Sequence, residues 1–210
     1  MIKSLTSLRF FFALAVFLHH YSVKGAVIFE NGFIGVSFFF ILSGFILSYS
    51  YKDRLFSGNI SKWDFYVARF ARIYPLHLLT FLMFITLLVY NNNLPDWKVL
   101  FSNLFLFQSW IPFKHYYFSV NEPSWSISCE AFFYAVFPAL LYFFMRGSRN
   151  TKIIVIASCL LTYAVSLLYP WKPQHAHALF YVNPIFRLVD FGIGVLSIQF
   201  GINMRKRKTI

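Results

Sequence analysis

Six apolar stretches, each close to the length that crosses a lipid bilayer, dominate this sequence. They cover residues 5–21, 33–51, 74–90, 124–145, 153–169 and 181–200. A transmembrane helix needs about 20 mostly apolar residues. Hydrophobic residues make up 59% of the chain and charged residues only 12%, a composition that no ordinary soluble domain needs. The sequence therefore predicts an all-α protein, a polytopic transmembrane bundle of about six crossing helices.

A seventh apolar stretch, residues 99–111, is too short to cross a bilayer. It lies between three consecutive asparagines, 91–93, and a polar segment, 113–123. We expect it to form an interfacial or re-entrant helix.

No internal repeat or linker divides the chain, so residues 1–210 are interpreted as one domain. The apolar run that follows Arg9 resembles a signal peptide in length, but no small-residue cleavage site follows it. It is interpreted as an uncleaved first helix.

Basic residues concentrate in the connections between the apolar stretches. The formal net charge is +12. With the N-terminus in the cytoplasm, 14 of the 19 Lys and Arg residues fall on the cytoplasmic side, as the positive-inside rule requires. The charge thus indicates topology, with both termini cytoplasmic, rather than a nucleic-acid partner.

Cys129 and Cys159 lie within apolar stretches, where a thiol acts as a small hydrophobe, and we expect no metal site.

Two ionisable residues, Arg9 and His20, share the first apolar stretch. Eleven residues at about 100° each make three turns plus roughly 20°, so both side chains project from one helix face. Such groups usually face a bundle interior or a water-filled cavity. A neutral imidazole can accept a proton from a hydroxyl and return it, which makes His20 a candidate base. A buried packing histidine is the alternative, and His19 points about 100° away.

The second apolar stretch carries small residues at i and i+4, Gly44 and Ser48. Small residues at this spacing let helices approach closely, and a packing seam is the preferred interpretation.

A pair of arginines, Arg69 and Arg72, precedes the third apolar stretch. Ser61 and Asp64 predict a capping-box helix start, and Tyr74-Pro75 predicts an interruption or kink. Two forked cations at a membrane surface suit a phosphate-bearing ligand. Topogenic arginines that meet lipid headgroups are the alternative, which spacing alone favours.

The fourth apolar stretch carries a polar stripe. Ser126, Glu130 and Tyr134 lie at i, i+4 and i+8 on one helix face. A carboxylate within a membrane span is a functional candidate by default, although Glu130 can also simply pair with a basic group on another helix.

Four motifs in order give the chain a family resemblance. They are Arg9 with His20 at R-x10-H spacing, residues 32–45, the Arg69-to-Pro75 segment RFARIYP, and the Pro123-to-Glu130 segment PSWSISCE. Together they resemble the membrane-bound acyltransferase family 3, which contains O-antigen and Nod-factor acetylases. The resemblance covers residues 5–200. Members usually have about ten crossings, so we expect a C-terminally truncated form, and Ser37 stands where many members carry an acidic residue.

The resemblance implies an integral acyltransferase of the bacterial inner membrane. It would move an acyl group, acetyl in most members, from cytoplasmic acyl-CoA to a hydroxyl of a cell-surface glycan or lipid-linked saccharide, with no permanently bound cofactor. The implied site residues are catalytic His20, Arg9 and Glu130, donor-binding Arg69 and Arg72, and cavity-lining Ser37, Ser43, Trp125, Ser126 and Tyr134. The rival interpretation is a non-catalytic protein, either a degenerate acyltransferase or a transporter-like bundle. Oligomeric state is left open.

Overall fold

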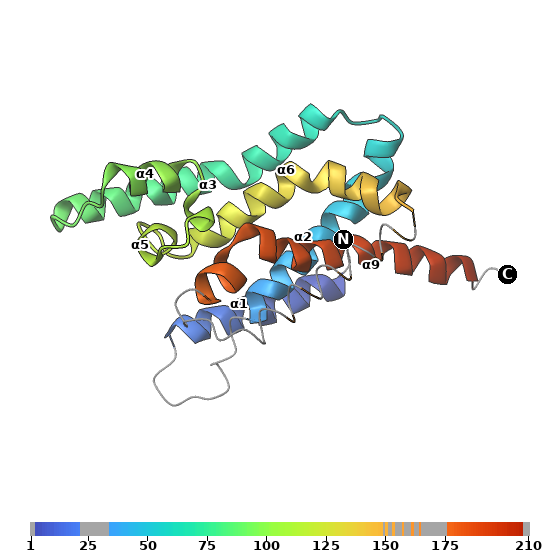
Figure 1. Ribbon diagram of the computed structural model, residues 1–210, viewed down its shortest axis with the longest axis horizontal. Helices are drawn as coiled ribbons and strands as arrows, with labels where there is room; N and C mark the ends of the chain where they lie inside the picture. Colours follow the sequence, from blue (N-terminus) through green and yellow to red (C-terminus); the bar gives the residue numbers. More distant parts are fainter. Residues whose placement is uncertain are drawn as a thin grey trace. The chain divides into compact units, whose positions relative to one another are not determined.

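All regular structure in the described residues is helical (Figure 1), which confirms the predicted all-α class. The computed structural model describes residues 3–21, 34–148 and 176–207, with isolated helical positions between 150 and 164. Side chains are described within 7–18, 34–148 and 176–198 and at those isolated positions. The α-helices are α1 Lys3–Tyr21, α2 Ile34–Phe56, α3 Lys62–Tyr90, α4 Trp97–Leu104, α5 Lys114–Tyr117, α6 Ser124–Arg146 and α9 Pro184–Arg207. A 3-10 turn, η2 Gln108–Trp110, follows α4, and a π-helical turn, η3 His177–Val182, precedes α9.

Three of the described helices, α2, α3 and α6, are long and apolar enough to cross a membrane. A shorter apolar segment, Ser7–Leu18, belongs to α1. The sixth predicted crossing, 181–200, corresponds to α9. This helix begins at Pro184, and the residues before it, His177–Val182, form a π-helical turn. Proline suits a first helical position, where its missing N–H costs nothing. The fifth predicted crossing, 153–169, lies mostly outside the described residues, so six crossings remain a prediction.

Helix α3 is longer than the predicted third crossing. The Ser61 hydroxyl accepts a hydrogen bond from the Asp64 backbone N–H at 3.0 Å, and the Asp64 carboxylate accepts one from the Ser61 N–H at 3.3 Å. These bonds confirm the predicted capping box. The predicted interruption at Tyr74-Pro75 does not occur, since one helix runs from residue 62 to 90 with Pro75 inside it. A proline removes a single backbone bond, and the helix is stabilised on both sides of it.

The segment between α3 and α6 is a short folded platform. Helix α4 has eight residues, about 12 Å at 1.5 Å per residue, which confirms that this stretch is too short to cross. Buried polar side chains fix it. His77 Nε2 donates to the Asn103 carbonyl at 3.0 Å, and the Asn103 side-chain amide donates to Ser119 Oγ at 2.8 Å. The platform is therefore tied to α3 at one side and to its own C-terminal turn at the other.

The chain divides into two compact units, residues 1–49 with 190–210 and residues 50–189. In the first unit, α2 and α9 meet at glycines. A Cβ atom on Gly44 would collide with the Phe191 carbonyl oxygen, and a Cβ atom on Gly194 would collide with that of Ile41. The predicted packing role of Gly44 is thus confirmed, and Ser48 in the same helix is fully buried.

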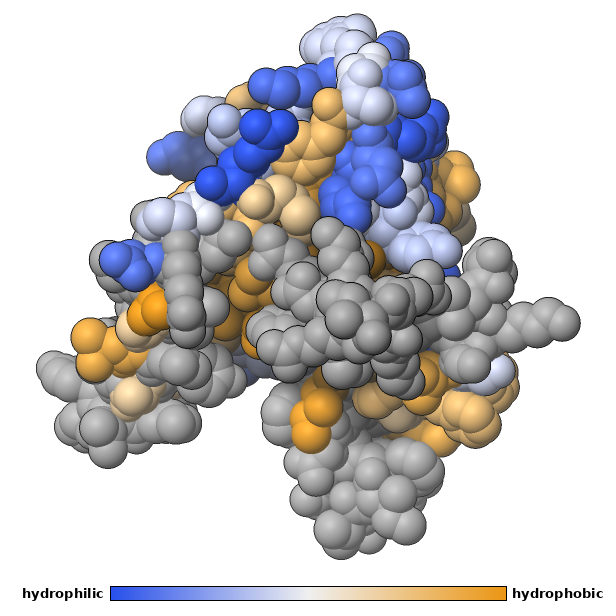
Figure 2. All heavy atoms as spheres, turned by 90° about the vertical axis from the view of Figure 1, so that its right-hand side faces the viewer, coloured by the Kyte–Doolittle hydropathy of each residue, from blue (hydrophilic) through white to orange (hydrophobic). Residues whose placement is uncertain are grey.

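In the second unit, α3 packs against α6. The Phe65 and Phe137 rings stack with centroids 5.3 Å apart, and both side chains are fully buried. Hydrophilic side chains gather where α2 ends and α3 begins, as Figure 2 shows. The exposed charged residues there include Arg54 and Lys62, and Arg146 ends α6. Such a cluster at the helix ends is typical of residues that stay outside the hydrocarbon.

Candidate functional site

The second unit holds Arg69 of α3 between two tyrosine rings. Its Cζ atom lies 5.1 Å from the centre of the Tyr51 ring and 5.8 Å from that of the Tyr134 ring. Its Nη2 atom also donates a hydrogen bond to Tyr51 Oη at 2.9 Å. Tyr51 is buried at the end of α2, and its ring packs edge-on against Phe65 at 5.1 Å. Three helices thus fix one guanidinium.

Most of the hydrogen-bonding capacity of Arg69 is unused. A guanidinium has five N–H donors, and Arg69 makes one such bond within the described part of the chain. Its buried Nε has no hydrogen-bond partner there, and no carboxylate of those residues lies within ion-pairing distance of it. A cation held by aromatic rings and not neutralised by a carboxylate suits an anionic ligand.

The polar stripe on α6 meets this arginine. The Tyr134 hydroxyl donates to Glu130 Oε2 at 3.3 Å, while its ring faces Arg69. Tyr134 therefore stands between a carboxylate one helical turn away and a guanidinium on another helix. Counting about 1.5 Å per residue, Tyr134 lies roughly 18 Å along α6 from Arg146. Tyr134, with Glu130 and Arg69 beside it, therefore lies near the middle of α6 rather than at its end.

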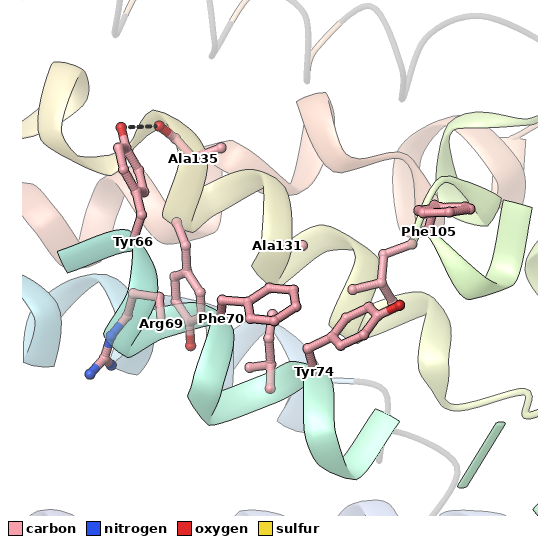
Figure 3. A pocket seen from close by; sticks show the side chains of 10 residues that line it. Tyr66, Arg69, Phe70, Tyr74, Phe105, Ala131 and Ala135 are labelled. Carbon is pink, nitrogen blue, oxygen red and sulfur yellow. Dashed lines mark hydrogen bonds between the residues drawn. The ribbon is translucent and has the colours of Figure 1, made fainter. Parts of the chain in front are cut away.

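A cavity of about 450 Å³ opens beside Arg69, between α3, α6 and the platform. Figure 3 shows its wall, with Arg69 at one edge and the rings of Phe70, Tyr74 and Phe105 along it. The lining residues are Tyr66, Arg69, Phe70, Ile73, Tyr74, Phe105, Leu106, Ala131, Tyr134 and Ala135. Arg69 is the one charged residue among them, so the cavity is apolar with a cation at its edge.

The structure separates the predicted arginine pair. Arg69 is partly buried and lines the cavity, whereas Arg72 is exposed and does not line it. Of the residues predicted for the site, Arg69, Glu130 and Tyr134 come together.

Trp125 and Ser126 lie at the start of α6, near the platform rather than the cavity. Trp125 is buried, and its backbone carbonyl accepts a hydrogen bond from Ser109 Oγ at 2.8 Å. The Ser126 hydroxyl donates to the Pro123 carbonyl at 2.9 Å, a bond within the helix start. Neither residue lines the cavity described above. In this structure their contacts serve to anchor the N-terminal end of α6.

An aromatic and basic cluster surrounds Trp125. The Trp125 and Tyr181 ring centres lie 5.0 Å apart, and Arg187 Cζ lies 4.4 Å from the centre of the Tyr181 ring. Arg187 Nε also donates to the Tyr181 carbonyl at 2.7 Å. The His177 and Tyr181 ring centres lie 5.0 Å apart, with the rings tilted by 39°. Burial lowers the pKa of His177, and the charges of Arg187 and Lys114 lower it further, so this imidazole is neutral at pH 7.

The other predicted site residues belong to the first unit. Arg9 is partly buried in α1, and Ser37 and Ser43 are partly buried in α2. The His20 backbone is helical, but its side chain lies outside the described residues, as does that of His19. The predicted pairing of Arg9 with His20 therefore remains a prediction.

Sequence reasoning missed Tyr51 and Tyr66. The Tyr66 hydroxyl donates to the Ala135 carbonyl at 3.1 Å and so closes one end of the cavity. Each tyrosine contacts a residue of another helix, Tyr51 contacting Arg69 and Tyr66 contacting Ala135. The spacing of residues along one helix cannot predict a contact with another helix.

Fold and site together define a helical membrane protein with a partly buried cation at the edge of an apolar cavity. A family model described as an acyltransferase domain matches residues 2–208. The chain therefore belongs to this acyltransferase family, as the motif resemblance predicted. No solved structure matches it.

Three curated relatives show how far the similarity extends. Acyltransferase MdmB of Streptomyces mycarofaciens is 41% identical over 153 residues, which cover 65% of this chain and 38% of the relative. Peptidoglycan O-acetyltransferase OatA of Listeria monocytogenes is 26% identical over 170 residues, covering 73% and 26%. The YrhL protein of Bacillus subtilis is 29% identical over 189 residues, covering 82% and 29%. The chain thus spans about a quarter to two fifths of the length of these relatives.

Proposed function

We propose that this chain carries out membrane O-acylation, moving an acyl group from cytoplasmic acyl-CoA to a hydroxyl of a cell-surface or exported glycan. The observation that carries the proposal is Arg69, which is held by Tyr51 and Tyr134 and makes a single hydrogen bond with the residues that the structure describes. Acyl-CoA is an anionic donor, and its phosphates match a guanidinium with donors to spare. Relatives named as acyltransferases, one of them a peptidoglycan O-acetyltransferase, support acylation of a glycan hydroxyl.

The proposed reaction is direct transfer. His20 removes the proton from the acceptor hydroxyl, and the oxygen attacks the thioester carbonyl. A carbon–oxygen bond forms, the carbon–sulfur bond breaks, and the leaving CoA thiolate takes the proton back from His20. Arg9 keeps that imidazole neutral and oriented, and Glu130 completes the proposed catalytic set. Arg69, together with the exposed Arg72 one turn further along α3, binds the phosphates of the donor by charge-assisted hydrogen bonds.

Location and orientation belong to the same proposal. We place the chain in the bacterial inner membrane with both termini cytoplasmic, because that orientation puts most basic residues on the donor side. The acceptor is then a saccharide presented at or across the membrane.

Membranes from expressing and non-expressing cells, incubated with labelled acetyl-CoA, test the proposal. We expect label in a glycan fraction only with the expressed chain, and none with His20→Ala. Arg69→Lys keeps the charge but loses the forked geometry, so we expect the donor KM to rise about tenfold. Arg146→Lys, at an exposed site at the end of α6, is the matched control. Glycan labelling that persists in His20→Ala would exclude the assigned base, and no labelling with the wild-type chain would exclude the activity.

A further inference from the structure

Several short elements meet at the end of α6 that lies away from Arg146. Helix α6 runs from Ser124 to Arg146, about 33 Å at 1.5 Å per residue, which is close to the hydrocarbon thickness of about 30 Å. Near its start α6 packs with η2 and η3, and α5 packs with η2. Within the second unit this end lies away from the charged loop between α2 and α3 (Figure 1). In the proposed orientation it faces the compartment opposite the cytoplasm.

An exposed histidine, His177, stands at the centre of the aromatic side chains at this end. Its ring centre lies 5.0 Å from that of Tyr181, 5.5 Å from that of Phe118 and 6.1 Å from that of Tyr117. Tyr181 in turn contacts the Trp125 ring. These five residues form the His177 cluster.

The His177 cluster is a built surface with an inner and an outer layer. Tyr117 and Trp125 are buried, Phe118 and Tyr181 are partly buried, and His177 is exposed. The inner rings thus hold the outer ones in place. Rings that simply anchor a membrane protein among lipid headgroups need no such inner layer, so this arrangement favours a ligand in the aqueous phase.

The imidazole of His177 can accept a hydrogen bond from such a ligand. Partial burial and the charges of Arg187 and Lys114 lower its pKa, so the ring is neutral at pH 7. A neutral imidazole has one nitrogen that donates a hydrogen bond and one that accepts. The outer layer of the cluster therefore combines aromatic faces with a hydrogen-bonding group that suits a hydroxyl.

Two cations flank the cluster. Arg187 is buried, and its Cζ atom lies 4.4 Å from the centre of the Tyr181 ring. Lys114 is exposed in α5. Within the part of the chain that the structure describes, neither Lys114 nor the exposed carboxylate of the same loop, Glu122, makes an ion pair. An anionic group that arrives beside His177 is therefore attracted by Lys114 without displacing a carboxylate from it.

These groups together match a saccharide. The C–H groups on one face of a sugar ring pack against the electron-rich face of an aromatic ring, and its hydroxyls need hydrogen-bonding partners. We propose that the His177 cluster binds the saccharide acceptor, and that this acceptor carries an anionic group beside Lys114. The inference rests on the proposed function and names its acceptor class and acceptor site. In this site Phe118 packs against the sugar ring and His177 accepts a hydrogen bond from a sugar hydroxyl.

Saccharide binding to the full chain in lipid nanodiscs, measured without any donor, tests this proposal. The anionic probes are the disaccharide GlcNAc-MurNAc, with a carboxylate, and N-acetylglucosamine 1-phosphate. Their neutral counterparts are chitobiose and N-acetylglucosamine. We expect an anionic probe to bind about threefold more tightly than its neutral counterpart. His177→Ala should weaken binding of every probe by roughly fivefold, whereas Lys114→Gln should abolish only the preference for the anionic one.

Two matched controls lie close by. His115 is exposed in α5, and its ring contacts Phe113 and Tyr116, so His115→Ala should leave binding unchanged. Lys98 is exposed in α4, so Lys98→Gln should keep the preference for anionic probes. Phe118→Leu keeps an apolar side chain without the ring and should also weaken binding, which keeps the test valid if His177→Ala fails to fold.

The outcomes separate this site from the proposed function. Unchanged binding in His177→Ala, or an equal loss in His115→Ala, overturns the His177 cluster as the site, and equal binding of anionic and neutral probes overturns the anionic acceptor. No saccharide binding by a chain that labels glycan overturns the site alone. Binding without acyl transfer supports the site and excludes only the transferase activity. A preference for the carboxylate probe assigns an acidic sugar, and one for the phosphate probe assigns a phosphate-linked sugar.

Discussion

The guanidinium of Arg69 depends on neighbours that carry no charge. A charged side chain inside a membrane layer is costly unless it is paired or solvated, and here two aromatic rings and one hydroxyl hold it. Cation–π contacts are worth about 0.5–2 kcal/mol each, more when desolvated. Among the described residues these partners are neutral, so the positive charge that the proposed donor would bind is not compensated by a carboxylate there.

In the proposed reaction, Tyr51 is a positioning residue for the donor, because it holds Arg69. Tyr51→Phe keeps the ring but removes the oxygen that accepts from Arg69 Nη2. We expect the donor KM to rise about fivefold, from the loss of roughly 1 kcal/mol of hydrogen bonding, with kcat nearly unchanged. Steady-state kinetics with purified membranes measure KM and kcat separately. Tyr142→Phe, at a tyrosine that is 60% exposed, is the control. A fall in kcat without a change in KM would contradict a positioning role.

The residues of this site could be predicted only in part. Arg69, Glu130 and Tyr134 were recognisable from the sequence because an ionisable residue or a polar stripe in an apolar helix stands out by its cost. Arg72 seemed equivalent to Arg69 by spacing, yet it is exposed. Three positions correspond to about 300° on a helix, and only the packing of α3 against α6 determines which of the two is enclosed.

At the scale of helices, the contact between α2 and α9 leaves no room for a side chain at Gly44 or Gly194. The backbone carbonyls of Phe191 and Ile41 occupy the positions where side chains of Gly44 and Gly194 would begin. Backbone approach of this kind is a common way for membrane helices to associate, because van der Waals packing replaces the hydrophobic effect there.

Gly44→Ala should separate these helices or strain them. Overpacking typically costs about 1–3 kcal/mol, so we expect a lower thermal midpoint in detergent, followed by fluorescence-detected size-exclusion chromatography. Gly194→Ala should do the same, because its contact is the mirror of the first. Ser50→Thr, which adds a methyl at an exposed position of α2, should leave the midpoint unchanged. Equal stability of all three variants would exclude the close approach.

Helix positions followed from the sequence more reliably than helix ends. Apolar runs of sufficient length located α2, α3 and α6, and the Ser61–Asp64 box located the start of α3. Of the two outcomes predicted at Pro75, the interruption is wrong and the kink stays a prediction, because a proline ends a helix only where the lost bond and the ring clash outweigh the packing around it. The π-helical turn before α9 had no sequence signal.

For the whole molecule, topology is the property that most needs measurement. Helix α3 has 29 residues, about 44 Å at 1.5 Å per residue, enough to cross a hydrocarbon core of about 30 Å. The loops before and after α3 must then face opposite compartments. The proposed function requires the loop before α3 to face the cytoplasm, where the donor is.

Single cysteines in those loops test the orientation. In a background with Cys159→Ala, we expect Ser57→Cys to react with an impermeant maleimide only in inside-out vesicles, and Asn93→Cys only in intact spheroplasts. Both positions are exposed. Cys129 is fully buried and donates a hydrogen bond to the Val182 carbonyl, so the remaining native thiol should stay unlabelled and serves as an internal control. Labelling of both positions from one side would contradict the crossing.

The platform between α3 and α6 also bears on how the chain is made. Gln108, Ser109 and Leu106 are bonded to the first turns of α6 through residues only 16 to 22 positions away. Closing so short a loop costs little entropy, and such local contacts form early. A nascent chain can therefore complete this segment and the start of α6 while the rest of the chain is still being synthesised.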